Sequence, residues 1–240
     1  MNKTWKQIWN SSNDQSFDHK NIYYSLIGLN RWEGWNHINN NNINYVDHER
    51  FESVIEFLDT QCKVNQYDSL FEVGCGCGAS LFPFFSKGNK VGGIDYSEIL
   101  IKYAQEILTP NYDFTVGEAD SISDEKYDIV FSNGVFLYFP NIEYSENVLT
   151  KMIKKSNKYV AILEIPDLTK REGAEIKRKN TIQDYEVKYK DLHHLYFDKK
   201  WFIDMGEKFH ATVEIFDNTD ICGSNSNLSD AYRFGCVYTV

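Results

Sequence analysis

The sequence predicts an α/β protein with a doubly wound, mainly parallel sheet, and three observations indicate this fold. Short apolar runs alternate with helical patterns between residues 68 and 165, and such alternation is typical of parallel strands joined by right-handed crossovers. A glycine-rich turn follows the first apolar run, and an acidic residue ends the second. Both features should lie at the carboxyl edge of the sheet, where ligands bind in this architecture.

The elements of the sheet are expected in a regular order. Strands are predicted at 68–73, 90–94, 112–116, 126–132 and 157–165, with helices at 79–87, 97–108 and 141–155 between them. A helix at 199–209 and two strand candidates, 212–216 and 231–240, complete the chain. Residues 217–230, which are rich in Asn, Ser and Gly, separate the last two strands.

Two segments lie outside this pattern. Residues 1–66 precede the first strand and contain many aromatic residues and an amphipathic helix from about Asp47 to Cys62. Residues 166–198 are inserted after the fifth strand. We therefore expect an N-terminal helical extension, 1–66, that acts as a lid, and one domain, 67–240, with a cap insertion at 166–198. A cap would exclude water and strengthen electrostatic interactions in a site.

Composition restricts the classes of partner. The chain has 240 residues and a net charge of −10, which argues against nucleic acid, because phosphate backbones attract Lys/Arg surfaces. The basic run Lys177–Lys179 is diluted by nearby acids and is expected on a solvated helix face. There is no apolar leader and no apolar window of 18 residues. We expect a cytoplasmic monomer or homodimer that binds a small molecule, and neither nucleic acid nor a membrane.

The cysteines indicate neither disulfides nor a metal centre. Their number, five, is odd, and Cys75 and Cys77 form a C-x-C pair without further ligands nearby in the sequence. We expect no metal, and we expect these two side chains to fill small spaces in the turn.

The glycine-rich turn is the most informative motif. It has the sequence Glu72-Val73-Gly74-Cys75-Gly76-Cys77-Gly78. Its glycines let the backbone bend and let a ligand approach closely, and the helix start beyond it offers N–H donors to a carboxylate or phosphate. The spacing differs from the G-x-G-x-x-G of dinucleotide-binding proteins. It resembles motif I, E/D-x-G-x-G-x-G, of the class I S-adenosylmethionine-dependent methyltransferases; a purely structural turn is the alternative.

Three later motifs strengthen this resemblance. Asp95 ends the second strand, where an acid can accept both hydroxyls of a ribose or, alternatively, cap the next helix. In the resembled family the acid in this place holds the adenosine ribose. Glu118-Ala119 then resembles the pair that binds adenine, with Asp120 as second choice, and Ser132-Asn133-Gly134 resembles motif IV.

The resemblance implies S-adenosylmethionine as cofactor, S-adenosylhomocysteine as product, and a seven-stranded, Rossmann-like sheet that ends in an antiparallel pair. The residues expected to bind the cofactor are Glu72, Gly74, Cys75, Gly76, Gly78, Asp95, Tyr96, Glu118, Ala119, Asn133 and Gly134.

Methyl transfer from a sulfonium requires a nucleophile placed in line, and a hydroxyl acceptor also benefits from a general base. His titrates near neutral pH, so His194 is the first candidate base, with His193 as the alternative. Glu164, at the end of the fifth strand, is a further candidate. A packing or surface role is the alternative for each histidine, and capping or charge pairing is the alternative for Glu164.

The acceptor should lie at the same edge of the sheet, near the two added segments. The candidate substrate-binding residues are Tyr23, Trp32, Trp35, His37, Phe136, Tyr138, Asp167 and Arg233. Core packing is the alternative for the aromatic residues. Arg233 lies in an otherwise apolar strand, so it either pairs with a buried carboxylate or binds an anionic acceptor.

The chain as a whole resembles small-molecule methyltransferases of bacterial surface-polysaccharide gene clusters, on patterns such as Trp32-Glu33-Gly34-Trp35-Asn36 and His194-Leu195-Tyr196-Phe197. This resemblance implies O-methylation of a sugar, nucleotide sugar or phosphorylated precursor. A small-molecule amine N-methyltransferase and a non-catalytic module that binds S-adenosylmethionine are the alternatives; the intact acids and glycines argue against the second.

Overall fold

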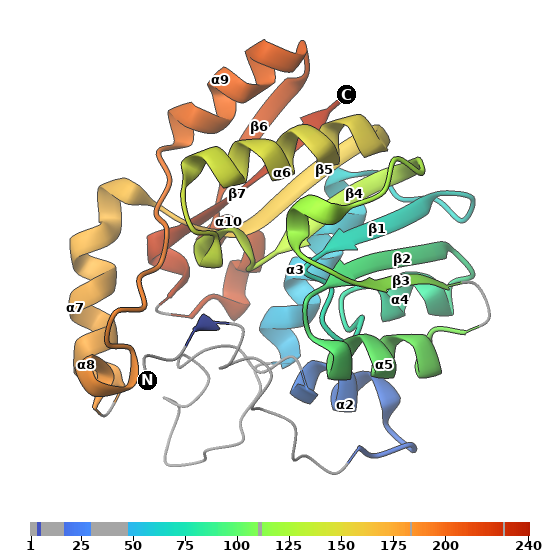
Figure 1. Ribbon diagram of the computed structural model, residues 1–240, viewed down its shortest axis with the longest axis horizontal. Helices are drawn as coiled ribbons and strands as arrows, with labels where there is room; N and C mark the ends of the chain where they lie inside the picture. Colours follow the sequence, from blue (N-terminus) through green and yellow to red (C-terminus); the bar gives the residue numbers. More distant parts are fainter. Residues whose placement is uncertain (1–3, 6–16, 30–47, 110–111, 183, 228) are drawn as a thin grey trace.

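The computed structural model describes residues 4–5, 17–29, 48–109, 112–182, 184–227 and 229–240. Its centre is one seven-stranded sheet with the order β3-β2-β1-β4-β5-β7-β6 (Figure 1). The strands are β1 (Ser69–Val73), β2 (Lys90–Asp95), β3 (Tyr112–Val116), β4 (Tyr127–Asn133), β5 (Ser156–Pro166), β6 (Thr212–Asp217) and β7 (Arg233–Thr239). All pairings are parallel except those of β7, which runs antiparallel to β5 and β6. The predicted fold class, a doubly wound and mainly parallel sheet, is confirmed.

Helices cover both faces of the sheet. One face carries α2 (Ile22–Leu29), α3 (His48–Gln61), α4 (Phe82–Ser86) and α5 (Glu98–Ile107), and the other carries α6 (Ile142–Lys155) and α9 (Lys199–Phe209). The insertion forms α7 (Arg171–Thr181) and α8 (Tyr185–Lys188), which lie beyond the carboxyl ends of the parallel strands (Figure 1). The short α10 (Asn218–Cys222) packs against α3. No helix in the described ranges is long and apolar enough to cross a membrane.

The two helical layers explain why the central strands are apolar along their length. In β1, Leu70 packs in the layer with α3 to α5, whereas Phe71 and Val73 pack in the layer with α6 and α9. In β5, Ala161 and Ile162 face opposite layers in the same way. Strands buried on both faces carry apolar side chains along most of their length, so the period-2 pattern of surface strands is absent here.

The first helix after the turn is shorter than the sequence pattern predicts. The expected helix spans 79–87, but α4 begins at Phe82. Gly78 has a φ of 80°, which ends the glycine turn in a left-handed conformation, and residues 79–81 form a further turn. Pro83 fits the first turn of a helix because it lacks the N–H that would be unpaired there.

A second correction concerns the basic run at 177–179. Arg178 is buried, with 4% of its surface exposed, so this residue does not lie on a solvated helix face as expected. Its guanidinium contacts Nδ1 of His194. The pattern of charges on α7 could not show this, because the partner comes from the end of the insertion.

A buried group of charged residues ties α3 to the end of β5 and the start of β7. We call Arg50, Glu164, Asp230 and Arg233 the guanidinium cluster. Arg50 contacts both Glu164 and Asp230, and Arg233 contacts Glu164. Asn218 donates to both carboxylates at 2.7 Å. The two guanidiniums lower the pKa of Glu164 to about 2 despite its burial. The carboxylates of Glu164 and Asp230 lie close enough to the Cys222 thiol to hold a metal ion together with it. Both carboxylates are, however, already paired with guanidiniums.

Candidate functional site

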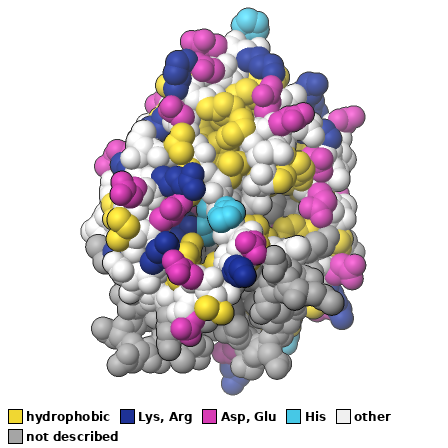
Figure 2. All heavy atoms as spheres, turned by 60° about the vertical axis from the view of Figure 1, so that its left-hand side comes forward, with side chains coloured by type: hydrophobic (Ala, Val, Ile, Leu, Met, Phe, Trp, Pro, Cys, Tyr) yellow, Lys and Arg dark blue, Asp and Glu magenta, His cyan; other side chains and the backbone are white. Residues whose placement is uncertain are grey.

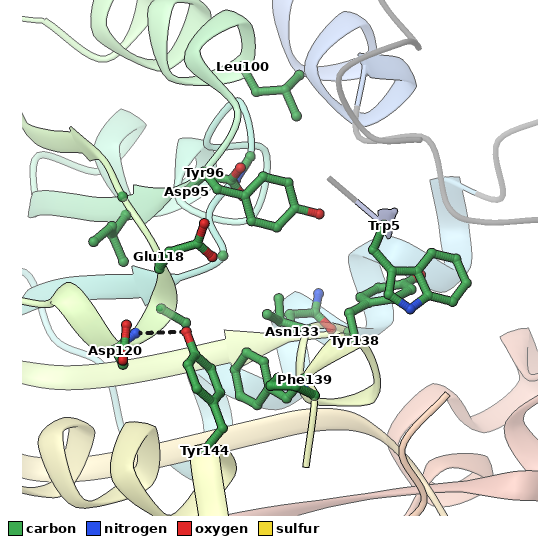
Figure 3. Close-up of a pocket in the computed structure, with 18 residues that line it drawn as sticks. Trp5, Asp95, Tyr96, Leu100, Glu118, Asp120, Asn133, Tyr138, Phe139 and Tyr144 are labelled. Carbon is green, nitrogen blue, oxygen red and sulfur yellow. Dashed lines mark hydrogen bonds between the residues drawn. The ribbon is translucent and has the colours of Figure 1, made fainter. Parts of the chain in front are cut away.

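A cavity of about 400 Å³ opens at the carboxyl edge of the sheet, next to the glycine turn. Figure 3 shows the carboxylates at one end of it, with Tyr96 and Tyr144 beside them, and Trp5 and Tyr138 at the other end. The residues that line it are Trp5, Gly74, Gly76, Ile94, Asp95, Tyr96, Leu100, Gly117, Glu118, Ala119, Asp120, Asn133, Gly134, Val135, Tyr138, Phe139, Pro140 and Tyr144. The sequence motifs from the ends of four strands therefore meet in one cavity.

The glycine turn contributes bare backbone to the cavity wall. Gly74 has a φ of 77°, and a Cβ atom at this position would lie 2.3 Å from a methyl carbon of Val135. Any larger residue would both strain the backbone and collide with the neighbouring loop. The main chain of the turn is held to β2, because the N–H groups of Gly74 and Cys75 donate to the Ile94 carbonyl at 2.8 and 3.1 Å.

Asp95 connects the turn to the end of β2. One of its carboxylate oxygens accepts from the Gly76 N–H at 3.0 Å, and the other accepts from the Ser97 N–H at 2.8 Å. Capping of α5 is performed by Ser97, whose hydroxyl accepts from the Leu100 N–H. Asp95 therefore shapes the glycine turn and still lines the cavity.

Glu118 and Ala119 lie where β3 leads into a short 3-10 turn, and both line the cavity. Asp120, the second choice from the sequence, also lines it. The Asp120 N–H donates to the Tyr144 hydroxyl at 3.3 Å, which fixes this loop against α6 (Figure 3). Three carboxylates, those of Asp95, Glu118 and Asp120, thus surround this end of the cavity, and no basic side chain is among the described lining residues.

Asn133 and Gly134 form the floor where β4 ends. Gly134 has a φ of 68°, and its N–H donates to the Leu163 carbonyl of β5 at 3.1 Å. Asn133 is 8% exposed, and its side-chain oxygen has no hydrogen-bond partner among the described residues. Buried polar atoms are nearly always paired, so this oxygen indicates a position where a ligand donor is expected.

Three residues predicted to bind a cofactor do not line the cavity. The Cys75 side chain is buried and packs beside Gly93, and Gly78 packs against Leu108. Glu72 is buried beneath the turn, and one of its oxygens has no hydrogen-bond partner among the described residues. Burial, with a smaller contribution from nearby Asp95, raises the pKa of Glu72 well above its usual value.

The aromatic end of the cavity contains Trp5 and Tyr138, whose ring centroids are 4.9 Å apart. Of the other predicted substrate-binding aromatics, Phe136 is buried against Phe139 and Phe202 in the core, and Tyr23 stacks on Phe82 with centroids 5.7 Å apart. The structure thus gives these two residues the packing role that the sequence left as the alternative.

The two candidate histidines occupy different environments. His193 is exposed. The His194 ring stacks on Trp5 at a centroid distance of 4.9 Å and lies 5.5 Å from the Tyr138 ring. A guanidinium can only donate, so Nδ1 of His194 accepts from Arg178 and the ring proton is assigned to Nε2. In this arrangement Nδ1 is not available as a general base.

The remaining polar candidates lie outside the cavity lining. Glu164 and Arg233 belong to the guanidinium cluster, so Arg233 has the structural pairing that was one of its two alternatives. Asp167 accepts from the N–H and the hydroxyl of Thr169 and caps the turn before α7. A paired carboxylate with a lowered pKa, such as Glu164, is a poor proton acceptor at neutral pH.

Trp32, Trp35 and His37 lie outside the described residues. Conversely, sequence reasoning did not select Trp5 or Tyr144, which line the cavity. Tyr144 lies on the cavity side of α6, and its place in the first turn of the helix predicted at 141–155 gave no local signal. Trp5 lies 69 positions before Gly74 in the chain, so only the tertiary fold brings it to the turn.

Comparisons with known proteins agree with this geometry. A family model described as a methyltransferase domain matches residues 66–214. A curated protein, putative methyltransferase 235L of Invertebrate iridescent virus 6, is 29% identical over 150 residues, which are 60% of this chain and 54% of that protein. The chain thus spans about half the length of this curated relative.

Solved structures show the same fold at low sequence identity. Magnesium protoporphyrin IX methyltransferase from Synechocystis PCC 6803, with bound S-adenosylmethionine, aligns with a TM-score of 0.58 and 16% identity over 95% of this chain and 99% of its own. A TehB-like S-adenosylmethionine-dependent methyltransferase from Corynebacterium glutamicum aligns with a TM-score of 0.54 and 17% identity over 78% and 86% of the two chains.

Proposed function

The chain belongs to the family of S-adenosylmethionine-dependent methyltransferases, and from this premise we propose that it methylates an oxygen atom of a small molecule. The acceptor class that we propose is a sugar, a nucleotide sugar or a related phosphorylated precursor of a surface polysaccharide. The observation that carries the proposal is the single cavity in which a bare glycine turn, three carboxylates and an unpaired amide oxygen meet.

The residues of the cavity fit S-adenosylmethionine. Gly74 and Gly76 present main chain without side chains to the cavity, so a ligand can approach the turn closely. The unpartnered oxygen of Asn133 can accept from the ammonium group of the methionine part. We propose that Asp95 binds the ribose hydroxyls and that Glu118 and the Ala119 N–H bind adenine. Tyr96 and Gly134 line the same cavity and complete the proposed contacts.

The cofactor supplies an electrophilic methyl group on a positively charged sulfur. The protein then has to hold the acceptor oxygen in line with that methyl group, and orientation alone can contribute about 7–11 kcal/mol to lowering the barrier. The carboxylates of the cavity favour a cationic ligand, and the surrounding aromatic side chains exclude water. A phosphate or carboxylate oxygen needs no base, which agrees with the engaged Nδ1 of His194.

We also propose that different segments of the chain bind the acceptor and the cofactor. The N-terminal extension, 1–66, and the insertion, 166–198, form the acceptor side, whereas the remainder of 67–240 binds the cofactor. The contact between Trp5 and His194 joins the two added segments beside the cavity.

Calorimetry tests the cofactor assignment. We expect binding of S-adenosylmethionine and S-adenosylhomocysteine with micromolar dissociation constants and no measurable binding of NAD. Binding of NAD alone would overturn the assignment. A screen of sugars, nucleotide sugars and sugar phosphates for release of S-adenosylhomocysteine then tests the acceptor class, and turnover of small amines alone would favour N-methylation.

A further inference from the structure

The aromatic end of the cavity differs from the carboxylate end in both shape and charge. Trp5, Tyr138 and Phe139 line this end, and no charged side chain is among them (Figure 3). Figure 3 shows the Trp5 indole beside Tyr138, across the cavity from Tyr96 and the carboxylates. Because the carboxylate end fits the nucleoside, the aromatic end is where the acceptor must lie.

Side chains from the insertion pack against the Trp5 indole. The imidazole of His194 stacks on the indole with an interplanar angle of 24°, and Tyr189 lies 6.1 Å from it between ring centroids. On the face of the molecule that α7 and α8 occupy, histidine side chains lie near the centre, among basic and acidic side chains (Figure 2). The indole is therefore held between the cavity and the insertion.

Arg178 determines how the imidazole is oriented. Its guanidinium is buried and donates to Nδ1 of His194. This contact fixes the ring plane and the tautomer of His194, and the stacked indole must follow the ring plane. A continuous chain of contacts thus runs from α7 through His194 and Trp5 to the cavity.

We propose that Trp5 is an acceptor-binding residue that stacks on a flat ring of the acceptor, and that Arg178 is a positioning residue that orients Trp5 through His194. This inference rests on the proposed methyltransferase function and specifies the acceptor further. The shared chemistry is a flat, weakly polar ring face, which an aromatic ring or the apolar face of a pyranose can present. Stacking suits both, because an indole offers a large rigid surface.

The first experiment measures binding without requiring turnover. Ring-bearing probes (catechol, 4-hydroxybenzoate, UDP-glucose and glucose 6-phosphate) and acyclic probes (glycerol 3-phosphate and serine) are titrated into the complex with S-adenosylhomocysteine. We expect at least one ring-bearing probe to bind and Trp5→Ala to weaken it about tenfold or more. Binding of catechol or 4-hydroxybenzoate would indicate an aromatic acceptor, and binding of UDP-glucose or glucose 6-phosphate would indicate a sugar. Absence of ring binding, or equal affinity in the variant, overturns the proposal.

The matched control is Trp201→Phe, which changes a tryptophan of α9 that does not line the cavity. It should leave probe affinity unchanged. Affinity for S-adenosylmethionine should be unchanged in Trp5→Ala as well. If S-adenosylmethionine itself fails to bind the wild-type protein, the proposed function fails; if it binds and the ring probes do not, only the present inference fails.

A double-mutant cycle tests the role of Arg178. We expect Arg178→Ala to weaken binding of the ring probe severalfold in the wild-type background, Arg178→Lys to recover part of this loss, and Arg178→Ala to have almost no effect in the Trp5→Ala background. Arg171→Ala, on the exposed side of the same helix, is the control and should not change probe affinity. An undiminished effect of Arg178→Ala in the Trp5→Ala background would overturn the positioning role.

Discussion

Glu72 and Glu164 are both fully buried in strands of the same sheet, yet their carboxyl groups behave in opposite ways. In the guanidinium cluster, Arg50 and Arg233 lower the pKa of Glu164 to about 2. Beneath the glycine turn, burial and the neighbouring Asp95 raise the pKa of Glu72 well above its usual value. Burial disfavours every charged carboxylate, so the neighbouring charges decide the outcome.

The contrast separates a structural region from the cavity that we propose as the binding region. The cluster contains its own positive charges, and its carboxylates lie outside the cavity lining. The described part of the cavity wall has three carboxylates and no basic side chain. An excess of negative charge next to a cavity favours a cationic ligand such as a sulfonium. A cluster in which opposite charges are paired instead stabilises the fold.

Removal of one guanidinium should have the largest effect. Arg50→Ala leaves Glu164 and Asp230 partly uncompensated in the interior, and the loss of one partner of a buried ion pair costs about 3–5 kcal/mol. We expect urea denaturation to show this loss in the free energy of unfolding. Lys200→Ala, which breaks an exposed pair with Asp204, should have little effect. A loss below about 1 kcal/mol for Arg50→Ala would show that the cluster does not stabilise the fold.

Acid should weaken the same cluster. The folded-state pKa of Glu164 lies below its unfolded value, so its stabilising contribution is present above about pH 4.5 and is lost as the pH falls towards 2. At about 1.4 kcal/mol per unit of difference between the two pKa values, the loss in the free energy of unfolding is on the order of 3 kcal/mol. Denaturation curves recorded between pH 5 and pH 2 should show a weaker pH dependence for Glu164→Gln than for the wild type. Identical slopes would contradict the assignment.

A substitution at Asp95 tests the proposed role of the cavity in binding the cofactor. Asp95→Ala removes a charged acceptor from the cavity and from the Gly76 N–H, and we expect affinity for S-adenosylmethionine to fall by roughly 1.5–3 kcal/mol. Calorimetry measures this change directly. Asp124→Ala removes an exposed carboxylate outside the cavity lining and should leave affinity unchanged. Equal affinity of Asp95→Ala and the wild type would exclude the ribose role.

Glu72→Gln should have the smallest effect on stability, and it should stabilise the protein instead of destabilising it. Because the folded-state pKa of Glu72 is raised, the wild type loses stability as the pH rises above about 4.5 towards that raised pKa. A glutamine cannot ionise, so the variant should be more stable than the wild type at pH 8 by on the order of 1 kcal/mol. The difference should vanish near pH 4.5. The control is Glu56→Gln on the exposed side of α3, and a destabilised Glu72→Gln at pH 8 would be inconsistent with a raised pKa.

The sequence predicted the sheet and the strand-end residues of the cavity because these depend on local patterns. Apolar runs, the spacing of Gly74, Gly76 and Gly78, and the acid that ends β2 are all read within a few positions. The boundaries were less accurate where a turn and Pro83 competed with a helical pattern, as at the start of α4. Cofactor contacts of Asp95, Glu118 and Asn133 stay predictions, and Asp95→Ala tests the first of them.

Charge pairing and the aromatic end of the cavity depended on the tertiary structure. Arg50 and Glu164 are 114 positions apart in the chain, and nothing local to either residue specifies the other. Trp5 likewise lies far along the chain from Arg178 and His194, which both belong to the insertion. The sequence by itself determined the fold and the family, because helix, strand and turn preferences are local. Only the tertiary structure decided which buried charges are paired and which aromatic side chains line the cavity, because those contacts form when distant segments pack together.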